Sequence, residues 1–267
     1  IRKGLFKRTV DHMKAVDGVS FELKHGQTLA LVGESGSGKT TIGRGILKLS
    51  QCSAGAIHYE QRNLADLDAV QLLQYRSDVQ VVFQDPYSSM NPRMLVGEIL
   101  AEGMLALGIC PDKAARELRI QSLLDQVGLP KDAALRYPHE FSGGQRQRIC
   151  IARALAVDPK VLILDEPTNH LDIDMIEWLE EYLKQGKQTI FMVTHDRYFL
   201  DSVCNQILEL DQQQIFKYTG NYAYYLEKKA DRESSFASTT EKAKNLYRKE
   251  LDWMRRQPKA RGTKAKA

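Results

Sequence analysis

A stretch of glycines and serines that ends in lysine and threonine carries the clearest chemistry in the sequence. It comprises Gly33, Glu34, Ser35, Gly36, Ser37, Gly38, Lys39 and Thr40. The glycines let the backbone curl so that several N–H groups point at one anion, and a following helix adds a favourable dipole. Lys39 can then reach the β- and γ-phosphates of a nucleotide, and the Thr40 hydroxyl can bind Mg²⁺. The pattern therefore predicts a phosphate-binding loop for a nucleoside triphosphate.

Polar residues that are able to act on a nucleotide follow three other apolar runs. They are Gln84, the adjacent carboxylates Asp165 and Glu166, and His195. Two carboxylates at the end of a buried strand need a partner, and Mg²⁺ with an attacking water supplies one. Taken alone, Gln84 and His195 are better explained as ordinary polar residues at strand ends.

A second helix start with accessible N–H groups lies in the middle of the chain. Its residues are Ser142, Gly143, Gly144 and Gln145, ahead of a helical pattern over residues 146–156. Ser142 can cap the helix, and the two glycines leave its first N–H groups open to an anion. An ordinary N-cap without a ligand explains the same residues and, in isolation, is the simpler interpretation.

The order and spacing of these motifs resemble those of the ATP-binding cassette (ABC) ATPases over about residues 13–217. In chain order they match the Walker A, Q-loop, signature, Walker B and switch-histidine elements of that family. The resemblance implies ATP and Mg²⁺ as ligands and ATP hydrolysis as the activity. It also implies a dimer, in which ATP lies between the phosphate loop of one cassette and the signature helix of a second cassette.

The resemblance implies a role for each motif residue. The phosphates would be held by Gly33, Glu34, Ser35, Gly36, Ser37, Gly38, Lys39, Thr40 and Thr41, and in the second cassette by Ser142, Gly143, Gly144 and Gln145. Thr40, Gln84 and Asp165 would complete the Mg²⁺ shell. Glu166 would polarise the attacking water, and His195 would contact the γ-phosphate. Together with Lys39 and Gln84, these two residues form the expected catalytic set.

The elements that must hold these residues predict an α/β fold. We expect a P-loop NTPase core sheet (RecA-like) with helices, an antiparallel β subdomain, a helical subdomain at about 87–155 and a C-terminal basic helical extension. Apolar runs predict buried strands at 28–32, 79–83, 161–164 and 189–193, and residues 55–59 suggest a further short strand. Helical spacing predicts helices at 41–49, 66–76, 96–107, 114–127 and 146–156. Residues 1–27 should form strand-turn-strand, with strands at 15–16 and 19–23, and Phe6 is the early aromatic candidate for stacking on adenine.

Composition favours an ordinary globular protein. The chain has 267 residues, of which 43% are hydrophobic and 27% charged. Because no apolar stretch approaches the roughly 18 residues of a membrane span and no signal peptide is visible, we expect a cytoplasmic protein. The cysteines at 52, 110, 150 and 204 form no CxxC pair, which favours free thiols over a zinc or iron–sulfur site.

Two subfamilies of ABC ATPases are resembled in turn along the chain. Up to about residue 164 it looks like the ATPases of oligopeptide and dipeptide importers, on residues 15–20, 33–36, 83–94 and 137–148. This part implies membrane permease subunits as partners and a peripheral position at the inner face of the cell membrane. From residue 168 onward the chain looks like the ABC-F ATPases, on residues 168–172, 194–200 and 220–225.

The C-terminal tail differs in charge from the rest of the chain. Residues 226–267 contain 13 Lys and Arg against 6 Asp and Glu, and they resemble the start of the ABC-F inter-cassette linker. That resemblance implies a ribosome or nucleic-acid partner, whereas a solvated basic helix end explains the same charges. We therefore predict an ABC ATPase domain at 1–217 and a basic helical extension at 218–267, in a chimera or fragment whose two parts meet near residue 165.

Overall fold

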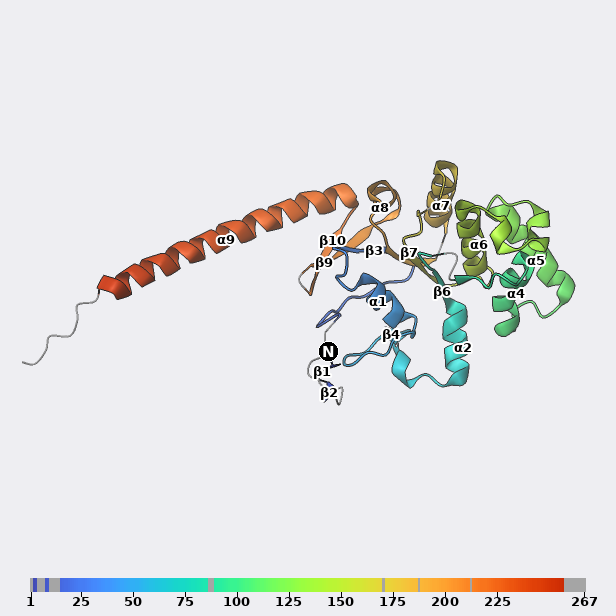
Figure 1. Cartoon of the computed structure of the whole chain (residues 1–267), viewed down its shortest axis with the longest axis horizontal. Helices are drawn as coiled ribbons and strands as arrows, with labels where there is room; N and C mark the ends of the chain where they lie inside the picture. The colour runs from blue at the N-terminus through green and yellow to red at the C-terminus, as the bar shows by residue number, and fades with distance from the viewer. Residues whose placement is uncertain are drawn as a thin grey trace, which may run out of the picture. The chain divides into compact units, whose positions relative to one another are not determined.

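The computed structural model describes residues 2–3, 8–9, 15–85, 89–169, 171–186, 188–211 and 213–256. The chain divides into two compact units, Ile1–Tyr222 and Ala223–Ala267. The first unit contains a central sheet, helices on both of its faces and a separate group of helices beyond one edge (Figure 1). The first unit also contains all the candidate site residues named above. Phe6, the expected adenine-stacking residue, lies outside the described residues.

A six-stranded sheet forms the centre of the first unit, in the order β10-β9-β3-β8-β7-β6. Its strands are β3 (Thr28–Gly33), β6 (Val79–Val82), β7 (Val161–Asp165), β8 (Thr189–Val193), β9 (Gln206–Asp211) and β10 (Gln214–Thr219). Five strands run parallel, and β10 pairs antiparallel with β9. The apolar runs are continuous because helices cover both faces of a parallel sheet. Parallel strands also end at one common edge, which places the residues after β3, β6, β7 and β8 near one another.

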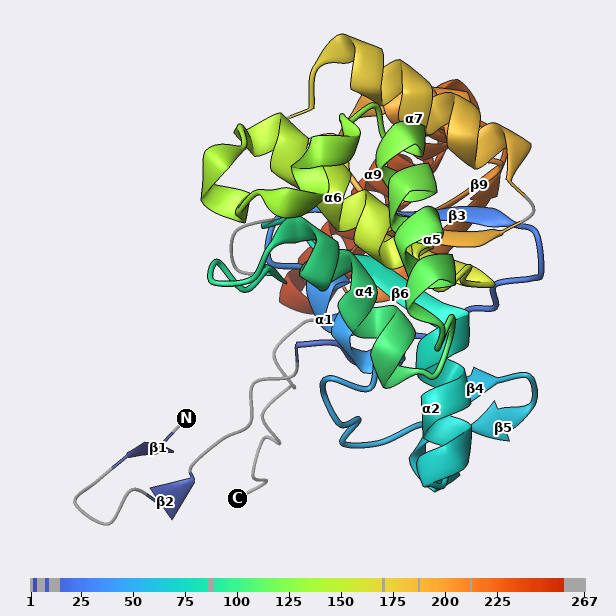
Figure 2. The ribbon, with the colours of Figure 1, turned by 90° about the vertical axis from the view of Figure 1, so that its right-hand side faces the viewer.

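Helices pack on both faces of this sheet. On one face lie α1 (Lys39–Ile46) and α2 (Ala69–Asp78), and on the other lie α7 (Ile173–Gln185) and α8 (Arg197–Val203) (Figures 1 and 2). Leu29, Leu31 and Phe191 are essentially inaccessible to solvent between these layers. The α/β fold predicted from the sequence is confirmed.

The inserted helical group contains α4 (Val96–Ala106), α5 (Lys113–Gln126) and α6 (Gly143–Leu155). Short 3₁₀ turns at Lys131–Leu135 and Pro138–Glu140 connect α5 to α6. The three helices pack on one another around fully buried side chains such as Leu100, Leu124 and Ile149, and they face the viewer in Figure 2. The helices predicted at 96–107, 114–127 and 146–156 are confirmed to within three residues at each end.

The strands predicted at 15–16 and 19–23 are wrong, because residues 15–27 form no strand. Their period-2 pattern is nevertheless real, since Val19, Phe21 and Leu23 pack against the core and Phe21 stacks on Phe191 with ring centroids 5.8 Å apart. Alternation reports which side chains are buried, but a strand also needs a neighbour for its backbone hydrogen bonds. The predicted strand at 55–59 shrinks to β4 (His58–Tyr59), which pairs with β5 (Arg62–Asn63). A further antiparallel pair joins β1 (Arg2–Lys3) and β2 (Arg8–Thr9).

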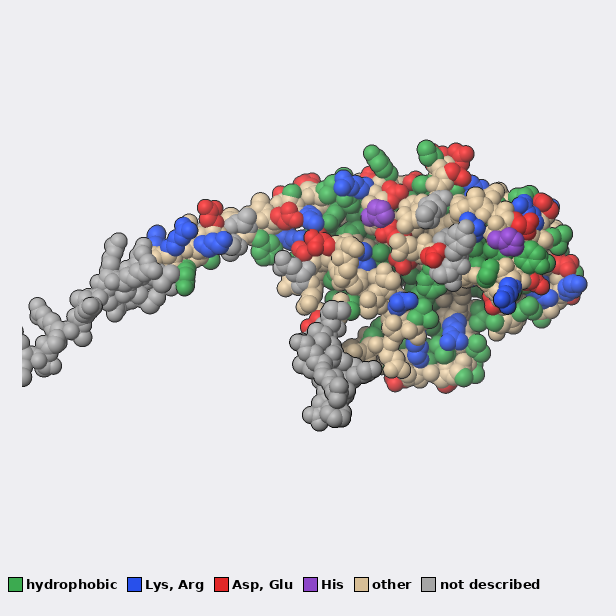
Figure 3. Space-filling model, in the orientation of Figure 1, with side chains coloured by type: hydrophobic (Ala, Val, Ile, Leu, Met, Phe, Trp, Pro, Cys, Tyr) green, Lys and Arg blue, Asp and Glu red, His purple; other side chains and the backbone are tan. Residues whose placement is uncertain are grey.

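A long helix, α9 (Tyr222–Arg256), begins at the last residue of the first unit and forms the described part of the second unit. Lysine, arginine and acidic side chains mix along it (Figure 3), with ion pairs one helical turn apart such as Lys228–Asp231 at 3.1 Å. The polar helix predicted for the tail is therefore confirmed, while most of the basic run at 255–261 lies outside the described residues. The predicted domain boundary at 217/218 falls within β10, which pairs with β9 along its full length. No helix among the described residues is long and apolar enough to cross a membrane.

Candidate active site

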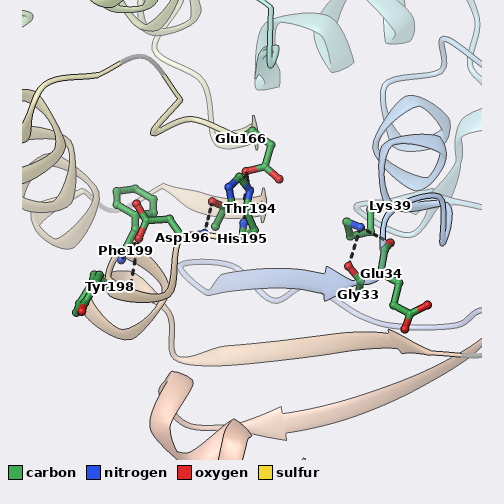
Figure 4. Close-up of polar contacts among 9 residues, drawn as sticks. All are labelled: Gly33, Glu34, Lys39, Glu166, Thr194, His195, Asp196, Tyr198 and Phe199. Carbon is green, nitrogen blue, oxygen red and sulfur yellow. Dashed lines mark hydrogen bonds and ion pairs between the residues drawn. The ribbon is translucent and has the colours of Figure 1, made fainter.

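The phosphate-binding loop connects β3 directly to α1. Gly36 and Gly38 have φ values of 80° and 106°, which side-chain-bearing residues rarely adopt. The ammonium group of Lys39 folds back over the loop and donates hydrogen bonds to the carbonyl oxygens of Gly33 (2.9 Å) and Glu34 (2.7 Å) (Figure 4). The Lys39 ammonium is therefore held by two uncharged carbonyl oxygens, next to the position where the loop is predicted to bind phosphate.

Several donors of the loop and of α1 are left available for an anion. Gly38, the N-cap of α1, provides no side-chain hydrogen bond to the first turn of the helix. The Ser37 hydroxyl is buried and has no hydrogen-bond partner among the described residues. Uncapped backbone N–H groups, a hydroxyl without a partner and an ammonium group form a donor set that fits a nucleotide triphosphate. Glu34, Ser35 and Thr41 are exposed around this position.

A cavity of about 330 Å³ adjoins the loop and collects residues from several elements. Thr40 from α1, Gln84 after β6 and Asp165 at the end of β7 all line it. Their hydroxyl, amide and carboxylate oxygens are ligands that Mg²⁺ accepts. Among the described residues no cluster of three or more His, Cys, Asp or Glu side chains could hold a metal. Mg²⁺ in this cavity would therefore complete its shell with phosphate oxygens and water, as it commonly does.

The electrostatics of Asp165 favour a bound cation. Burial raises the pKa of this carboxyl above its usual range, and the neighbouring Glu166 raises it further. Lys39 and Arg44 oppose the increase but do not cancel it. A carboxylate that is destabilised by burial and by a like charge is stabilised by a nearby cation, so the site suits Mg²⁺.

Glu166 and His195 form a contact of their own. One oxygen of Glu166 lies 2.8 Å from Nδ1 of His195 and 3.3 Å from its backbone nitrogen. The Glu166 side chain is 13% exposed and that of His195 is 78% exposed, so the pair leads from the protein interior to the surface. The backbone of Glu166 has φ of 49°, and its N–H donates to the Val193 carbonyl at 2.7 Å. A left-handed conformation is uncommon for glutamate and aims this side chain at the end of β8.

The end of β8 and the start of α8 fix the backbone of His195. Asp196 caps α8, because its carboxylate accepts hydrogen bonds from the backbone N–H groups of Tyr198 (3.1 Å) and Phe199 (3.2 Å) (Figure 4). The Asp196 N–H in turn donates to the Thr194 hydroxyl at 3.2 Å. The backbone of His195 is therefore fixed between the buried strand β8 and the capped helix α8.

The second helix start that was predicted to bind an anion lies apart from this cavity. Ser142 caps α6 by accepting from the Gln145 N–H at 3.3 Å, and the Gln145 side chain accepts from the Ser142 N–H at 3.0 Å. The predicted N-cap is confirmed. None of Ser142, Gly143, Gly144 and Gln145 lines the cavity that contains Thr40, Gln84 and Asp165. The fold thus brings together the phosphate loop and the strand-end residues, but not the residues of the α6 start.

Several residues near the site were missed in the sequence analysis. Arg44, Asp85 and Ser89 line the cavity beside the predicted residues. Arg44 follows Thr40 by four residues on α1, so helical spacing alone would have placed the two side chains on one face. Asp85 and Ser89 follow Gln84 in the chain and carry no comparable signal.

Replacing Gly38 by alanine is expected to destabilise the protein more than replacing Gly36. Both glycines have positive φ, so an added Cβ strains the backbone in both. At Gly38 the new Cβ would also lie 2.6 Å from the Ala15 oxygen, whereas at Gly36 no heavy atom lies within 4 Å. We expect losses in the free energy of unfolding of about 3 kcal/mol for Gly38→Ala and about 1 kcal/mol for Gly36→Ala, measured by urea denaturation. Equal losses would contradict the packing of residue 38 against residues 15 and 16.

Two family models match the chain, and both are described as "ABC transporter". One matches residues 16–169 and the other matches residues 208–267.

The oligopeptide transport ATP-binding protein OppF of Streptococcus mutans is 44% identical over 205 residues, which are 75% of this chain and 67% of that protein. An uncharacterized ABC transporter ATP-binding protein of Escherichia coli, YejF, is 45% identical over 80% of this chain and 41% of its own length. The glutathione import ATP-binding protein GsiA of Pectobacterium atrosepticum is 41% identical over 80% of this chain and 35% of its own length. The chain thus spans about two thirds of the first relative and less than half of the other two.

Solved structures of nucleotide-binding cassettes resemble the fold. The dimeric post-hydrolysis state of the ATP-binding cassette MJ0796, bound to ADP and Pi, has a TM-score of 0.71 and 26% identity over 80% of this chain and 94% of that one. The structure of cbiO1 from Clostridium perfringens, part of the cbiONQ transporter complex, has a TM-score of 0.67 and 26% identity over 83% of this chain and 88% of that one.

Proposed function

Because this chain belongs to the ABC transporter family of ATP-binding cassettes, we propose that it is the ATP-hydrolysing motor subunit of a peptide-type importer. The observation that carries this proposal is the 44% identity over 205 residues with a protein named for oligopeptide transport. The glutathione importer subunit has a similar identity, and glutathione is itself a peptide. The proposed cargo is therefore a short peptide, and the proposed partners are the membrane permease subunits of such an importer.

The residues of the cavity and the phosphate loop support the ATP chemistry. Lys39 and the N–H groups at the start of α1 would bind the β- and γ-phosphates, and Thr40, Gln84 and Asp165 would hold Mg²⁺. Mg²⁺, when bound, offsets the charge that develops on the transferred phosphoryl group. Catalysis of this kind depends on positioning and electrostatic stabilisation more than on covalent chemistry.

Glu166 is the proposed base that orients and deprotonates the attacking water. Its side chain is largely shielded from solvent, and its second oxygen remains directed away from His195 (Figure 4). His195 is the proposed contact to the γ-phosphate. Its Nδ1 lies beside the Glu166 carboxylate, and most of its ring is exposed to solvent. The geometry thus allows one residue to sense the γ-phosphate and the other to act on water.

A dimer completes the proposed site. Residues 142–145 do not line the cavity of their own chain. They form the N-cap and first turn of α6, a helix of 13 residues. A cassette with 26% identity has been solved as a dimer with ADP and Pi bound. We therefore assign residues 142–145 to the ATP held by a second cassette, which is either a copy of this chain or a related chain.

Co-purification with membrane subunits is the expected result that tests this function. A tagged full-length chain, co-expressed with a peptide-permease membrane pair, should be retained with that pair in detergent and should not sediment with ribosomes. We expect the permease contact to lie within residues 1–222, so a variant truncated after residue 226 should retain it. Binding to ribosomes that disappears on this truncation, without permease binding, would overturn the importer proposal. It would favour the alternative drawn from the basic tail, which stays a prediction.

A further inference from the structure

The outer face of α7 carries a hollow that is lined mainly by acidic side chains. Its volume is about 460 Å³, and its lining residues are Asp174, Glu177, Trp178, Glu180 and Glu181. The opposite face of α7 is buried through Met175, Leu179 and Leu183, and the helix lies at the outside of its layer (Figure 2). None of the residues of this α7 hollow lines the cavity beside the phosphate loop.

Three carboxylates of the α7 hollow have no neutralising partner. Asp174, Glu177 and Glu181 are exposed, and they form no ion pair with any described residue. Glu180 differs, because it lies 3.6 Å from Lys184 and accepts a hydrogen bond from the Ser202 hydroxyl. Like charges three or four residues apart on a helix are neighbours and destabilise it. A cationic partner would therefore relieve a repulsion that α7 does not balance internally.

Trp178 gives the α7 hollow an aromatic surface beside these charges. Its ring stacks on that of Tyr182, with centroids 5.4 Å apart, and the Tyr182 hydroxyl accepts a hydrogen bond from Nε2 of Gln188 at 3.5 Å. An indole face attracts ammonium and guanidinium groups, and it also packs against their apolar stems. No cluster of acidic, histidine or cysteine side chains within the described part of the chain could hold a metal ion. The chemistry of the hollow thus suits lysine and arginine side chains rather than a metal.

A segment of complementary charge comes at the end of the sequence. Residues 255–267 contain six Lys and Arg and no Asp or Glu, whereas residues 1–225 contain 25 Lys and Arg against 28 Asp and Glu. The segment has no aromatic or large aliphatic side chain, so its contact with a protein surface must be mainly electrostatic. It follows a helix of 35 residues, which is about 50 Å long. A basic segment carried at the end of so long a helix is well suited to reach another molecule.

We propose that the α7 hollow is a docking site for the basic segment, residues 255–267, of a second copy of this chain. Cationic side chains of the segment neutralise Asp174, Glu177 and Glu181, and one of them lies over the Trp178 indole. This contact needs no nucleotide, and it is separate from the composite ATP site of the proposed dimer. Exposed ion pairs are individually weak and are screened by salt, so the docking is reversible and salt-sensitive.

Self-association of the full chain without nucleotide tests this docking. Trp178 and Trp253 are the two tryptophans of the chain, so Trp253→Phe leaves Trp178 as a reporter in the hollow. We expect Trp178 emission to change as protein concentration rises, with the same midpoint as the increase in size measured by light scattering. Raising the ionic strength from about 0.05 M to about 0.5 M should weaken the association about 10-fold. A synthetic peptide of residues 255–267 should compete and restore the monomeric size.

Charge-neutralising variants locate the two sides of the contact. Glu177→Gln with Glu181→Gln should weaken the association about 5-fold, as expected for the loss of two exposed ion pairs. Lys259→Gln with Arg261→Gln should have a similar effect from the other side. Because the two pairs of residues belong to one contact, combining all four substitutions should weaken the association less than the product of the separate effects.

A matched control removes the same charge elsewhere on the surface. Glu102→Gln with Asp125→Asn changes two exposed carboxylates on α4 and α5, outside the α7 hollow. This variant should associate like the unmodified chain. All samples are treated with nuclease first, because a nucleic acid could bridge two basic segments.

Four results would each contradict the docking site. Association that disappears on nuclease treatment would indicate a nucleic-acid bridge, and equal weakening in the control would indicate an effect of net charge. A chain that stays monomeric while Trp178 emission responds to Lys259→Gln with Arg261→Gln would place the segment on its own molecule. A monomeric chain whose emission ignores those substitutions would leave the hollow without the proposed occupant.

Discussion

Replacing Glu166 by glutamine is expected to lower ATP turnover by about 10³-fold while leaving ATP binding unchanged. An amide is too weak a base to take a proton from water at neutral pH. The amide oxygen can still accept from the His195 backbone N–H, which the carboxylate now does at 3.3 Å, so the local structure should persist. The nucleotide would then be bound but not consumed, and the dimer that ATP holds together should accumulate.

Three measurements check this result on one preparation: phosphate release, ATP binding, and the apparent size of the protein with and without ATP. Glu180→Gln on α7 is a matched control, because its carboxylate accepts from the Ser202 hydroxyl away from the cavity. The control should keep wild-type turnover. Near-normal hydrolysis by Glu166→Gln would remove Glu166 from the proposed role and direct attention to Asp165 or His195.

Most of the site could be predicted because its residues stand where buried strands end. Apolar runs identified β3, β6, β7 and β8, and parallel strands bring their carboxyl ends to one edge. The structure accordingly places Gln84 and Asp165 in one cavity with Thr40, although they are separated by more than 40 residues. The helix cap at Ser142 was equally visible, since the pattern Ser-x-x-Gln satisfies two N–H groups within four residues.

The remaining features depend on partners that local sequence does not specify. Phe21 looked like part of a strand because its neighbours alternate, yet the backbone around it has no strand assigned. The contact between Arg148 and Asp172 joins residues 24 positions apart, and only the tertiary packing of α6, which lies against β6, brings them together. The positive φ of Glu166 accompanies a hydrogen bond from its N–H to Val193 on a neighbouring strand. Residues nearby in the sequence therefore do not predict it.

Mixing two inactive variants is expected to restore hydrolysis if the site is shared between chains. Lys39→Met removes the ammonium group that now rests on the Gly33 and Glu34 carbonyls, so the phosphate loop loses its main cation. Gly144→Asp adds a carboxylate to the first turn of α6, where it suits the helix dipole but repels phosphate. Each variant alone should retain about 1% of wild-type turnover or less, as expected for the loss of a major electrostatic contact.

In an equal mixture about half of the dimers contain one chain of each kind, and each such dimer has one intact composite site. About a quarter of the wild-type sites are then available. The matched control places both substitutions in one chain and mixes it equally with wild type. If the site is shared, mixed dimers contain no intact site and about a quarter of the activity survives; if each chain is self-sufficient, about half survives. A mixture of the single variants that stays inactive, together with survival of half in the control, would contradict a shared site and return residues 142–145 to the role of an ordinary helix cap.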